Sequence, residues 1–326
     1  MQFTFLWQHF VVLADLDVKA LQLMYKGLRE STHATYSSAQ KRYMSFCALY
    51  KYDPLPTTEK ILCNFVTFLA YEGLSHSSIR VYLSGVRSLH IFEGFPLWEK
   101  SPKLILIMKA IQSQGKPPQK KLPITLDVLL KLFGSTVFPK GYQGLLYRAV
   151  CSLLFFGGMR RGELIVKNSY NYKVDLSLYS ITVYSSHIQV NLKRTKTTIH
   201  GLSFSLPCML PDEVLCGHCD FIAFYTERLK IQPKGINAPL FVNTDGTLFC
   251  YDQFLKQLKS LLMFVGLDPG MYSGHSFRAG LATQAGMKGL SDYQILAMGR
   301  WKSSSYLGYI HNTLEQVKTT FQQLLN

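Results

Sequence analysis

The chain has 326 residues, of which 48% are hydrophobic and 17% charged. This length favours two domains with separate cores, and the composition excludes a largely disordered chain. Lys and Arg number 35 against 20 Asp and Glu, so the net charge of +15 points to a polyanionic partner, nucleic acid first. On composition alone, two alternatives stay open: a basic interaction protein that binds no nucleic acid, and one that visits acidic membrane surfaces.

The cysteines and the apolar segments bear on the cellular compartment. Seven cysteines without a repeating spacing favour free thiols in a reducing environment over a disulfide framework. The apolar N-terminus lacks a basic region and soon meets Asp15 and Asp17, which is a poor match to a signal peptide. No apolar run has the length of a transmembrane helix. We therefore expect a cytoplasmic or nuclear protein.

Residues 1–112 are expected to form a helical N-terminal domain, because apolar residues recur at helical spacing from about Glu30 to Gln112. Ser31 or Thr32 is the candidate N-cap of the first helix, and Pro56 and Ser75 mark the starts of two more. Four basic side chains fall between the apolar positions, where they either contact a phosphate backbone or remain solvated: Lys41, Arg42, Arg80 and Arg87.

A linker and a second domain follow. Residues 113–121 contain two prolines, three lysines and no apolar side chain, so the segment 113–122 is expected to be extended. The second domain, residues 123–326, begins with an N-cap at Thr125 and a buried helix over residues 145–156. Further periodicities predict strands at 179–184, 188–192 and 202–206 and helices at 221–229 and 251–265. The expected fold is mainly α with one small antiparallel β-sheet.

Four separated segments of the second domain concentrate unusual residues. They are Gly157-Gly-Met-Arg160-Arg-Gly-Glu163, Leu192-Lys-Arg-Thr-Lys196, Gly274-His275-Ser-Phe-Arg278, and Gly299-Arg-Trp301 running on to Tyr309-Ile. Each segment alone is weak evidence, since such short patterns recur by chance. In this order they resemble the catalytic domain of the tyrosine recombinase family, from Thr125 to Tyr309. The preceding helical region resembles the core-binding domain of that family only in its position along the chain and in its helical residue pattern.

The resemblance assigns a role to each residue in the cleavage of a phosphodiester. Arg160 and Arg278 would stabilise the negative charge of the phosphorane, because a guanidinium matches two oxygens at once. Tyr309 would be the nucleophile and His275 the acceptor of its proton. Lys196, in the turn after a strand, would protonate the leaving 5′-oxygen.

The remaining site residues have supporting roles or are rivals. The resemblance implies that Glu163 supports the site and that Trp301 donates its indole N–H to a phosphate oxygen. Lys193 and Arg194 are rivals of Lys196 as general acid, or they bind backbone phosphates.

Tyr306 is a rival nucleophile. Tyr309 lies eight residues after Trp301, one fewer than in much of the family. The following Ile310 reproduces the usual Tyr-Ile ending, which favours Tyr309 and leaves Tyr306 for packing.

The motif Cys216-Gly-His-Cys219 resembles half of a zinc site. No second pair stands at zinc-finger spacing, and Cys208 and Cys250 look poorly placed to complete it. The sequence therefore predicts no metal, and the recombinase reaction requires no cofactor.

The tail beyond Tyr309 carries apolar residues at helical spacing, at Leu314, Val317, Phe321 and Leu324. Such a helix either folds back on its own domain or docks on a neighbouring protomer, which by resemblance would build a homo-tetramer on double-stranded DNA.

The sequence thus predicts a recombinase or integrase that works through a 3′-phosphotyrosyl intermediate. The sequences around His275 and Trp301 are similar to those of recombinases from eukaryotic mobile elements of the DIRS, Ngaro and Crypton kind. This resemblance would place the protein in the nucleus. An inactive DNA-binding descendant and a type IB topoisomerase-like enzyme are the alternatives.

Overall fold

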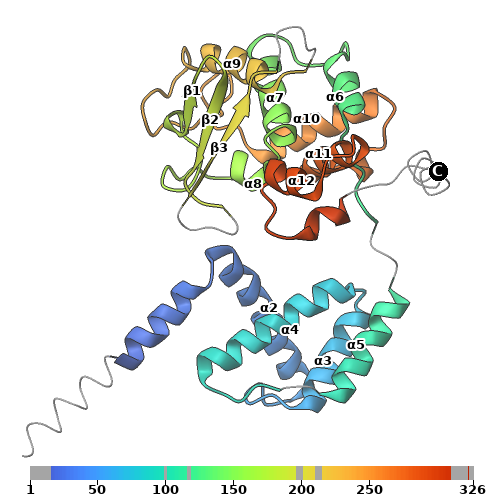
Figure 1. Cartoon of the computed structure of the whole chain (residues 1–326). Coiled ribbons are helices and arrows are strands. Elements are labelled where there is room, and N and C mark those ends of the chain that lie inside the picture. Colours follow the sequence, from blue (N-terminus) through green and yellow to red (C-terminus); the bar gives the residue numbers. More distant parts are fainter. Residues whose placement is uncertain are drawn as a thin grey trace, which may run out of the picture. The chain divides into compact units, whose positions relative to one another are not determined.

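The computed structural model describes residues 16–98, 101–115, 119–195, 201–209 and 215–309, together with Gln322. The chain divides into two compact units, Met1–Pro118 and Gln119–Asn326, each with its own hydrophobic core (Figure 1). No helix among the described residues is long and apolar enough to cross a membrane.

The first unit is built from helices. Residues 16–27 are helical, and they are followed by α2 (Glu30–Tyr50), α3 (Glu59–Tyr71), α4 (His76–Glu93) and α5 (Pro102–Gln114). The last of these continues two residues into the segment predicted as a linker. The core of this unit is aromatic, with Phe65 in ring contact with both Tyr43 and Phe46.

The starts of these helices test the predicted caps. Ser75 caps α4 as expected, since its hydroxyl accepts the N–H of Ser78. The prediction of Ser31 or Thr32 as the cap of α2 is wrong, because the Arg29 carbonyl already accepts the N–H of Thr32 and the helix begins at Glu30.

Close packing of α2 against α4 depends on a glycine. A Cβ atom on Gly85 would lie 2.5 Å from the Cβ of Ala39 and 3.3 Å from the carbonyl oxygen of Tyr36. Any larger side chain would push the two helices apart.

The second unit begins with α6 (Leu126–Phe133), α7 (Gly141–Phe155) and the short α8 (Arg161–Leu164). Strands β1 (Ile181–Val183), β2 (His187–Leu192) and β3 (Leu202–Pro207) form one antiparallel sheet in the order β1-β2-β3. The chain then forms α9 (Gly217–Arg228), α10 (Tyr251–Phe264), α11 (His275–Met287) and α12 (Asp292–Gly299), with 3-10 turns η1 (Leu178–Ser180), η2 (Pro269–Met271) and η3 (Ser304–Gly308). The predicted mainly α fold with a small antiparallel sheet is confirmed.

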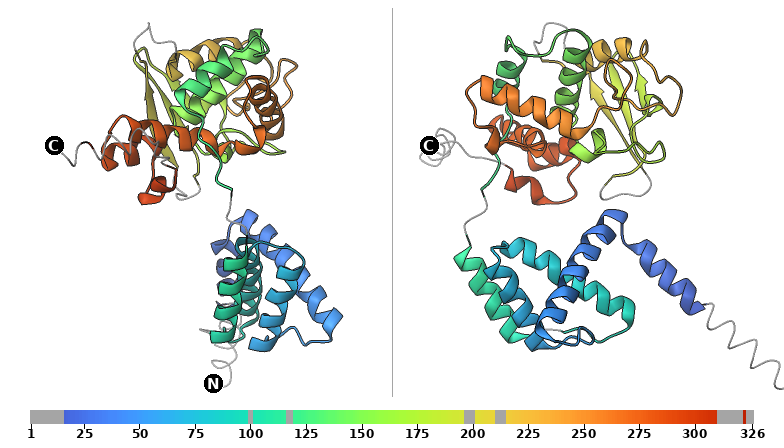
Figure 2. Two further views of the ribbon diagram at one scale, coloured as in Figure 1. Left: turned by 90° about the vertical axis from the view of Figure 1, so that its right-hand side faces the viewer. Right: turned by 180° about the vertical axis from the view of Figure 1, so that it is seen from behind.

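Helix α7 lies at the centre of the second unit, with the sheet on one side and α10 on the other (Figure 2). Its residues from Ala149 to Phe155 are all buried. Asp220 of α9 binds Arg148 and Ser152 of α7, which locks the two helices together. Since α7 ends at Phe155, five residues before Arg160, this buried helix helps to fix the position of that arginine.

Candidate active site

The segment after α7 brings Arg160 and Glu163 into contact. Gly158 adopts φ +51°, and a Cβ atom there would lie 2.9 Å from the Leu281 side chain and 3.1 Å from the Cα of Gly299. The turn therefore fits closely between α11 and α12 only as glycine. The Glu163 carboxylate then accepts the backbone N–H of Arg160 at 3.0 Å and its guanidinium at 2.8 Å.

Arg278 of α11 lies at the back of this turn. Only 2% of the residue is exposed, and its guanidinium donates to the carbonyl of Gly158. The guanidinium carbon also lies 4.4 Å from the centroid of the Trp301 ring. Burial first, and then the positive charges of Arg160 and Arg300, lower the pKa of Arg278 to about 10. The group therefore stays charged at neutral pH.

Arg300 is a member of the cluster to which the sequence assigned no role. It donates to the Gly157 carbonyl at 2.5 Å, lies 3.6 Å from the Glu163 carboxylate, and stacks 4.0 Å from the centroid of Phe204. Burial is the main cause that lowers its pKa. A Cβ on Gly299 would overlap the Trp301 ring, at 1.6 Å. The sequence Gly-Arg-Trp could therefore have indicated a closely packed turn at this position.

The two tyrosines after Trp301 have different environments. Tyr309 is half-buried, its ring centroid lies 6.3 Å from that of Trp301, and its carbonyl accepts the Thr283 hydroxyl of α11 at 2.8 Å. Tyr306 is 1% exposed, and its hydroxyl has no hydrogen-bond partner of normal geometry among the described residues. The nearby carboxylate of Asp292 raises the pKa of Tyr306. These contacts favour packing for Tyr306 and leave Tyr309 as the candidate nucleophile.

The other predicted residues lie around the cluster or outside the described chain. His275 is exposed at the first position of α11, one turn before Arg278. Lys196 lies outside the described residues, although Thr195 just before it lines the pocket described next. Lys193 donates to the carbonyl of Tyr172 and lies 3.3 Å from the Ser177 hydroxyl, while Arg194 is exposed.

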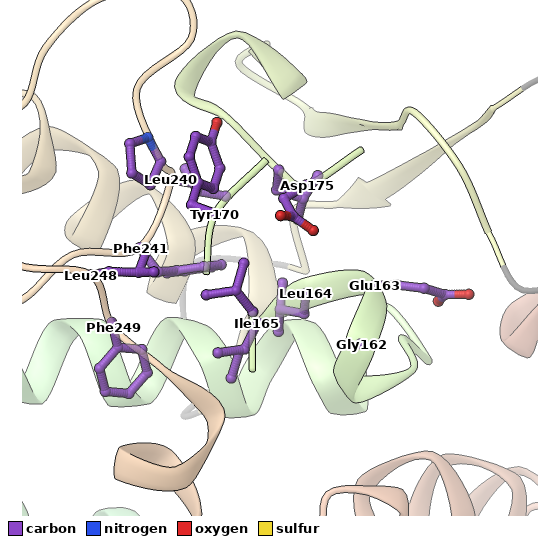
Figure 3. A pocket seen from close by; sticks show the side chains of 13 residues that line it. Gly162, Glu163, Leu164, Ile165, Tyr170, Asp175, Leu240, Phe241, Leu248 and Phe249 are labelled. Atoms are coloured by element: carbon purple, nitrogen blue, oxygen red, sulfur yellow. The ribbon is translucent and has the colours of Figure 1, made fainter. Parts of the chain in front are cut away.

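A cavity of about 420 Å³ opens beside the arginines. It is bordered by Arg160, Glu163, Arg300, Trp301 and Thr195, and its remaining walls are formed by side chains of α12, by Leu202 of β3 and by Lys302. A separate hollow on the other side of α8 holds only about 10 Å³, roughly the room for one water, and Glu163 points away from its apolar walls (Figure 3). The wider cavity is therefore the candidate site.

The basic residues predicted to face DNA in the first unit are all exposed: Lys41 and Arg42 on α2, Arg80 and Arg87 on α4. Arg42 is engaged within its own unit, because it pairs with Glu72 and its guanidinium lies 5.4 Å from the centroid of Phe68.

The prediction that Cys208 is poorly placed to complete a metal site is wrong. The end of β3 brings Cys208 to the start of α9, where it joins Cys216, His218 and Cys219 with all four ligand atoms within 4.8 Å of one another. Spacing along the chain could not show this, since strand pairing creates the proximity.

Comparisons with known proteins agree with this geometry. No protein-family model matches the chain. An integrase/recombinase XerD homolog of Selenomonas ruminantium is 22% identical over 309 residues, covering 92% of this chain and 86% of the relative. The tyrosine recombinase XerD of Listeria monocytogenes serotype 4b (strain F2365) is 24% identical over 307 residues, covering 92% of this chain and 94% of the relative.

Among solved structures, the chain is similar to a lambda integrase tetramer bound to a Holliday junction. The TM-score is 0.56 at 16% identity, with 92% of this chain and 77% of that chain covered. At this identity the likeness concerns the fold. None of the comparisons tests the similarity to DIRS, Ngaro and Crypton recombinases, which stays a prediction.

Replacing Arg300 with methionine tests how the arginine cluster is held. The variant keeps an apolar stem over Phe204 but leaves the Gly157 carbonyl and the Glu163 carboxylate each without one partner. We expect the free energy of unfolding, measured by urea titration with circular dichroism, to fall by about 1–3 kcal/mol. Lys288→Met, an exposed change at the end of α11, should stay within about 0.5 kcal/mol of the unchanged protein. Equal losses in both variants would contradict the assigned role of Arg300.

Proposed function

We propose that this chain, a member of the tyrosine recombinase family, is a site-specific recombinase that cleaves and rejoins double-stranded DNA through a 3′-phosphotyrosyl intermediate. One observation carries the proposal: Arg160, Arg278, Trp301 and Tyr309, from three separate segments, lie together, and Arg160 and Trp301 line the cavity. In addition, the Nη2 atom of Arg278 is buried and has no hydrogen-bond partner among the described residues. Such a free donor is suited to bind a phosphate oxygen.

In the proposed reaction the Tyr309 oxygen attacks the scissile phosphorus, and the bond between phosphorus and the 5′-oxygen breaks. His275 takes the phenolic proton, and Lys196 gives a proton to the departing 5′-oxygen. Arg160 and Arg278 bind the non-bridging oxygens, whose negative charge grows in the transition state. Because the phosphotyrosyl ester keeps the energy of the cleaved linkage, a 5′-hydroxyl from another strand reverses the step without ATP.

Three further residues support these groups. Trp301 donates its indole N–H to a phosphate oxygen while its ring packs under Arg278. Glu163 and Arg300 are positioning residues, since they bind Arg160 and the turn at Gly157. The chemistry assigned to these side chains needs no metal ion or organic cofactor.

The nucleophile is tested with nicked suicide duplexes taken from the DNA that flanks the gene. We expect a covalent protein–DNA adduct that peptide mapping places on Tyr309, absent in Tyr309→Phe. Tyr306→Phe is the matched control, because Tyr306 is buried and Phe keeps its aromatic ring.

The outcomes of this experiment separate the alternatives. An adduct on Tyr306 would overturn the assignment of the nucleophile. Binding of these duplexes without any adduct would favour an inactive DNA-binding descendant of a recombinase.

We propose that Lys41, Arg80 and Arg87 contact DNA phosphates, because all three are exposed on α2 and α4. The logarithm of the association constant should fall linearly with the logarithm of salt concentration, and Arg80→Ala and Arg87→Ala should each reduce that slope by about 1. Lys103→Ala on α5 is the control, since Lys103 already lies 3.8 Å from the Glu59 carboxylate. A slope that neither substitution changes would remove these residues from the DNA contact.

We propose that the tail beyond Tyr309 docks on a neighbouring protomer and builds a homo-tetramer on two duplexes. The spacing of Leu314 and Val317 supports it, and these residues lie outside the described chain. Sedimentation on DNA should show a tetramer for the whole chain and smaller complexes once residues 312–326 are removed. An unchanged tetramer would mean that the tail folds back on its own domain. A monomer that relaxes supercoiled DNA would indicate a topoisomerase-like enzyme.

The protein's origin in a eukaryotic mobile element, and with it a nuclear location, belongs to the same proposal. It rests on the sequences around His275 and Trp301 alone. Adducts formed on the ends of the element that encodes the chain would support it.

A further inference from the structure

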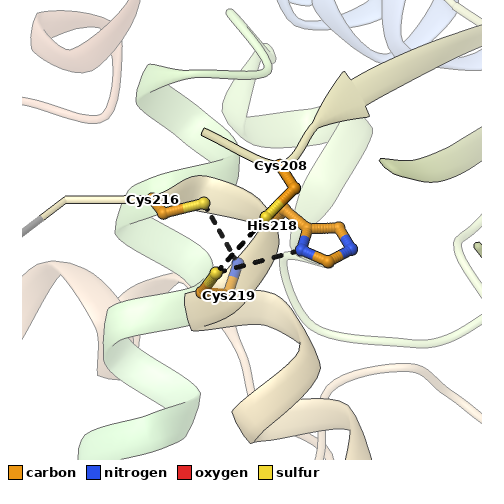
Figure 4. Close-up of side chains that lie close together, drawn as sticks. All are labelled: Cys208, Cys216, His218 and Cys219. Carbon is orange, nitrogen blue, oxygen red and sulfur yellow. Dashed lines mark hydrogen bonds between the residues drawn. The ribbon is translucent and has the colours of Figure 1, made fainter. Parts of the chain in front are cut away.

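Three thiols and one imidazole gather where β3 ends and α9 begins (Figure 4). Cys216 is the N-cap residue of α9, His218 and Cys219 lie in its first turn, and Cys208 directly follows β3. The Cys208 backbone N–H donates to the Ser186 carbonyl at 2.8 Å, so the sheet itself holds Cys208 in place.

The distances suit one tetrahedral ion. With Zn–S bonds of about 2.3 Å, two sulfur ligands of tetrahedral zinc lie about 3.8 Å apart. The sulfur atoms of Cys208 and Cys219 are 3.7 Å apart, and His218 Nδ1 lies 4.0 Å from the Cys219 sulfur. Three thiolates with one imidazole form a ligand set typical of structural zinc.

Neighbouring groups also orient the ligands. His218 Nε2 lies 3.3 Å from the Tyr184 carbonyl. With the proton on Nε2 donated to that carbonyl, the lone pair of Nδ1 faces the sulfurs, which is the usual arrangement of a zinc-bound histidine. The backbone N–H groups of Met209 and Cys219 donate to the Cys216 sulfur at 3.3 and 3.5 Å. Such donors stabilise a thiolate, the form that binds metal.

We propose that Cys208, Cys216, His218 and Cys219 bind one zinc ion as a structural site. Four protein ligands fill the tetrahedral shell, so no position remains for a reacting water. The ion would fasten the end of β3 to the start of α9, and it would therefore hold the strand that follows Lys196 along the chain. This proposal is independent of the catalytic roles given above.

The zinc content of the full-length protein, purified under reducing conditions, tests the proposal. Mass spectrometry of the metals should find about one zinc ion per chain, and Cys219→Ser should lose most of it. Cys219 is exposed, so the substitution does not disturb a packed core. Cys250→Ser is the matched control, because Cys250 lies outside the cluster and should keep the full zinc content.

A second measurement reports on coordination and does not depend on activity. Cobalt(II) in place of zinc should give the visible bands of a tetrahedral site and thiolate-to-cobalt charge transfer, both lost in Cys219→Ser. Removing zinc with a chelator should lower the Tm of the unchanged protein and leave that of Cys219→Ser as it was. A folded, reduced protein without bound metal would overturn the proposal, as would an intact mass showing a disulfide between Cys208 and Cys219.

Discussion

The site depends on holding three guanidinium groups together against their mutual repulsion. Burial first, and then the positive charges of Arg160 and Arg300, lower the pKa of Arg278 to about 10. Like charges repel, and they repel more strongly in a buried, weakly polar site than in water. One carboxylate, that of Glu163, and the carbonyls of Gly157 and Gly158 oppose this repulsion. A phosphate that enters the cluster would add the missing negative charge, so binding and neutralisation would be the same event.

This arrangement also explains why the elements around the cluster pack so closely. The turn at Gly158 has its carbonyl bound by Arg278 from α11 and approached by Arg300 from the end of α12. Because one oxygen receives both side chains, a shift of either helix would move a guanidinium away from the cavity. The rigidity of α7 behind the turn is therefore a condition for the geometry of the site.

The fold was largely predictable from the sequence because the local signals were strong. Alternating residues gave β2 and β3 almost to the residue, and the apolar run gave α7. The predictions failed where a residue's role depends on tertiary contacts. Arg300 is an example, because it binds the carbonyl of Gly157, which is more than a hundred positions away in the chain. Cys208 was misjudged for the same reason: its partners in α9 are neighbours through strand placement, and no spacing rule covers that. Lys196 stays a prediction, since it lies outside the described residues.

Strand β3 connects the two centres of the second unit. Residues two apart on a strand share a face, so Phe204, Leu206 and Cys208 form one row. Phe204 packs under Arg300, a Cβ on Gly217 would come within 2.9 Å of Leu206, and Cys208 belongs to the zinc cluster. One strand thus touches the arginine cluster near its beginning and the metal ligands at its end. Both contacts fix the same strand, so the arginine cluster and the metal ligands share one support.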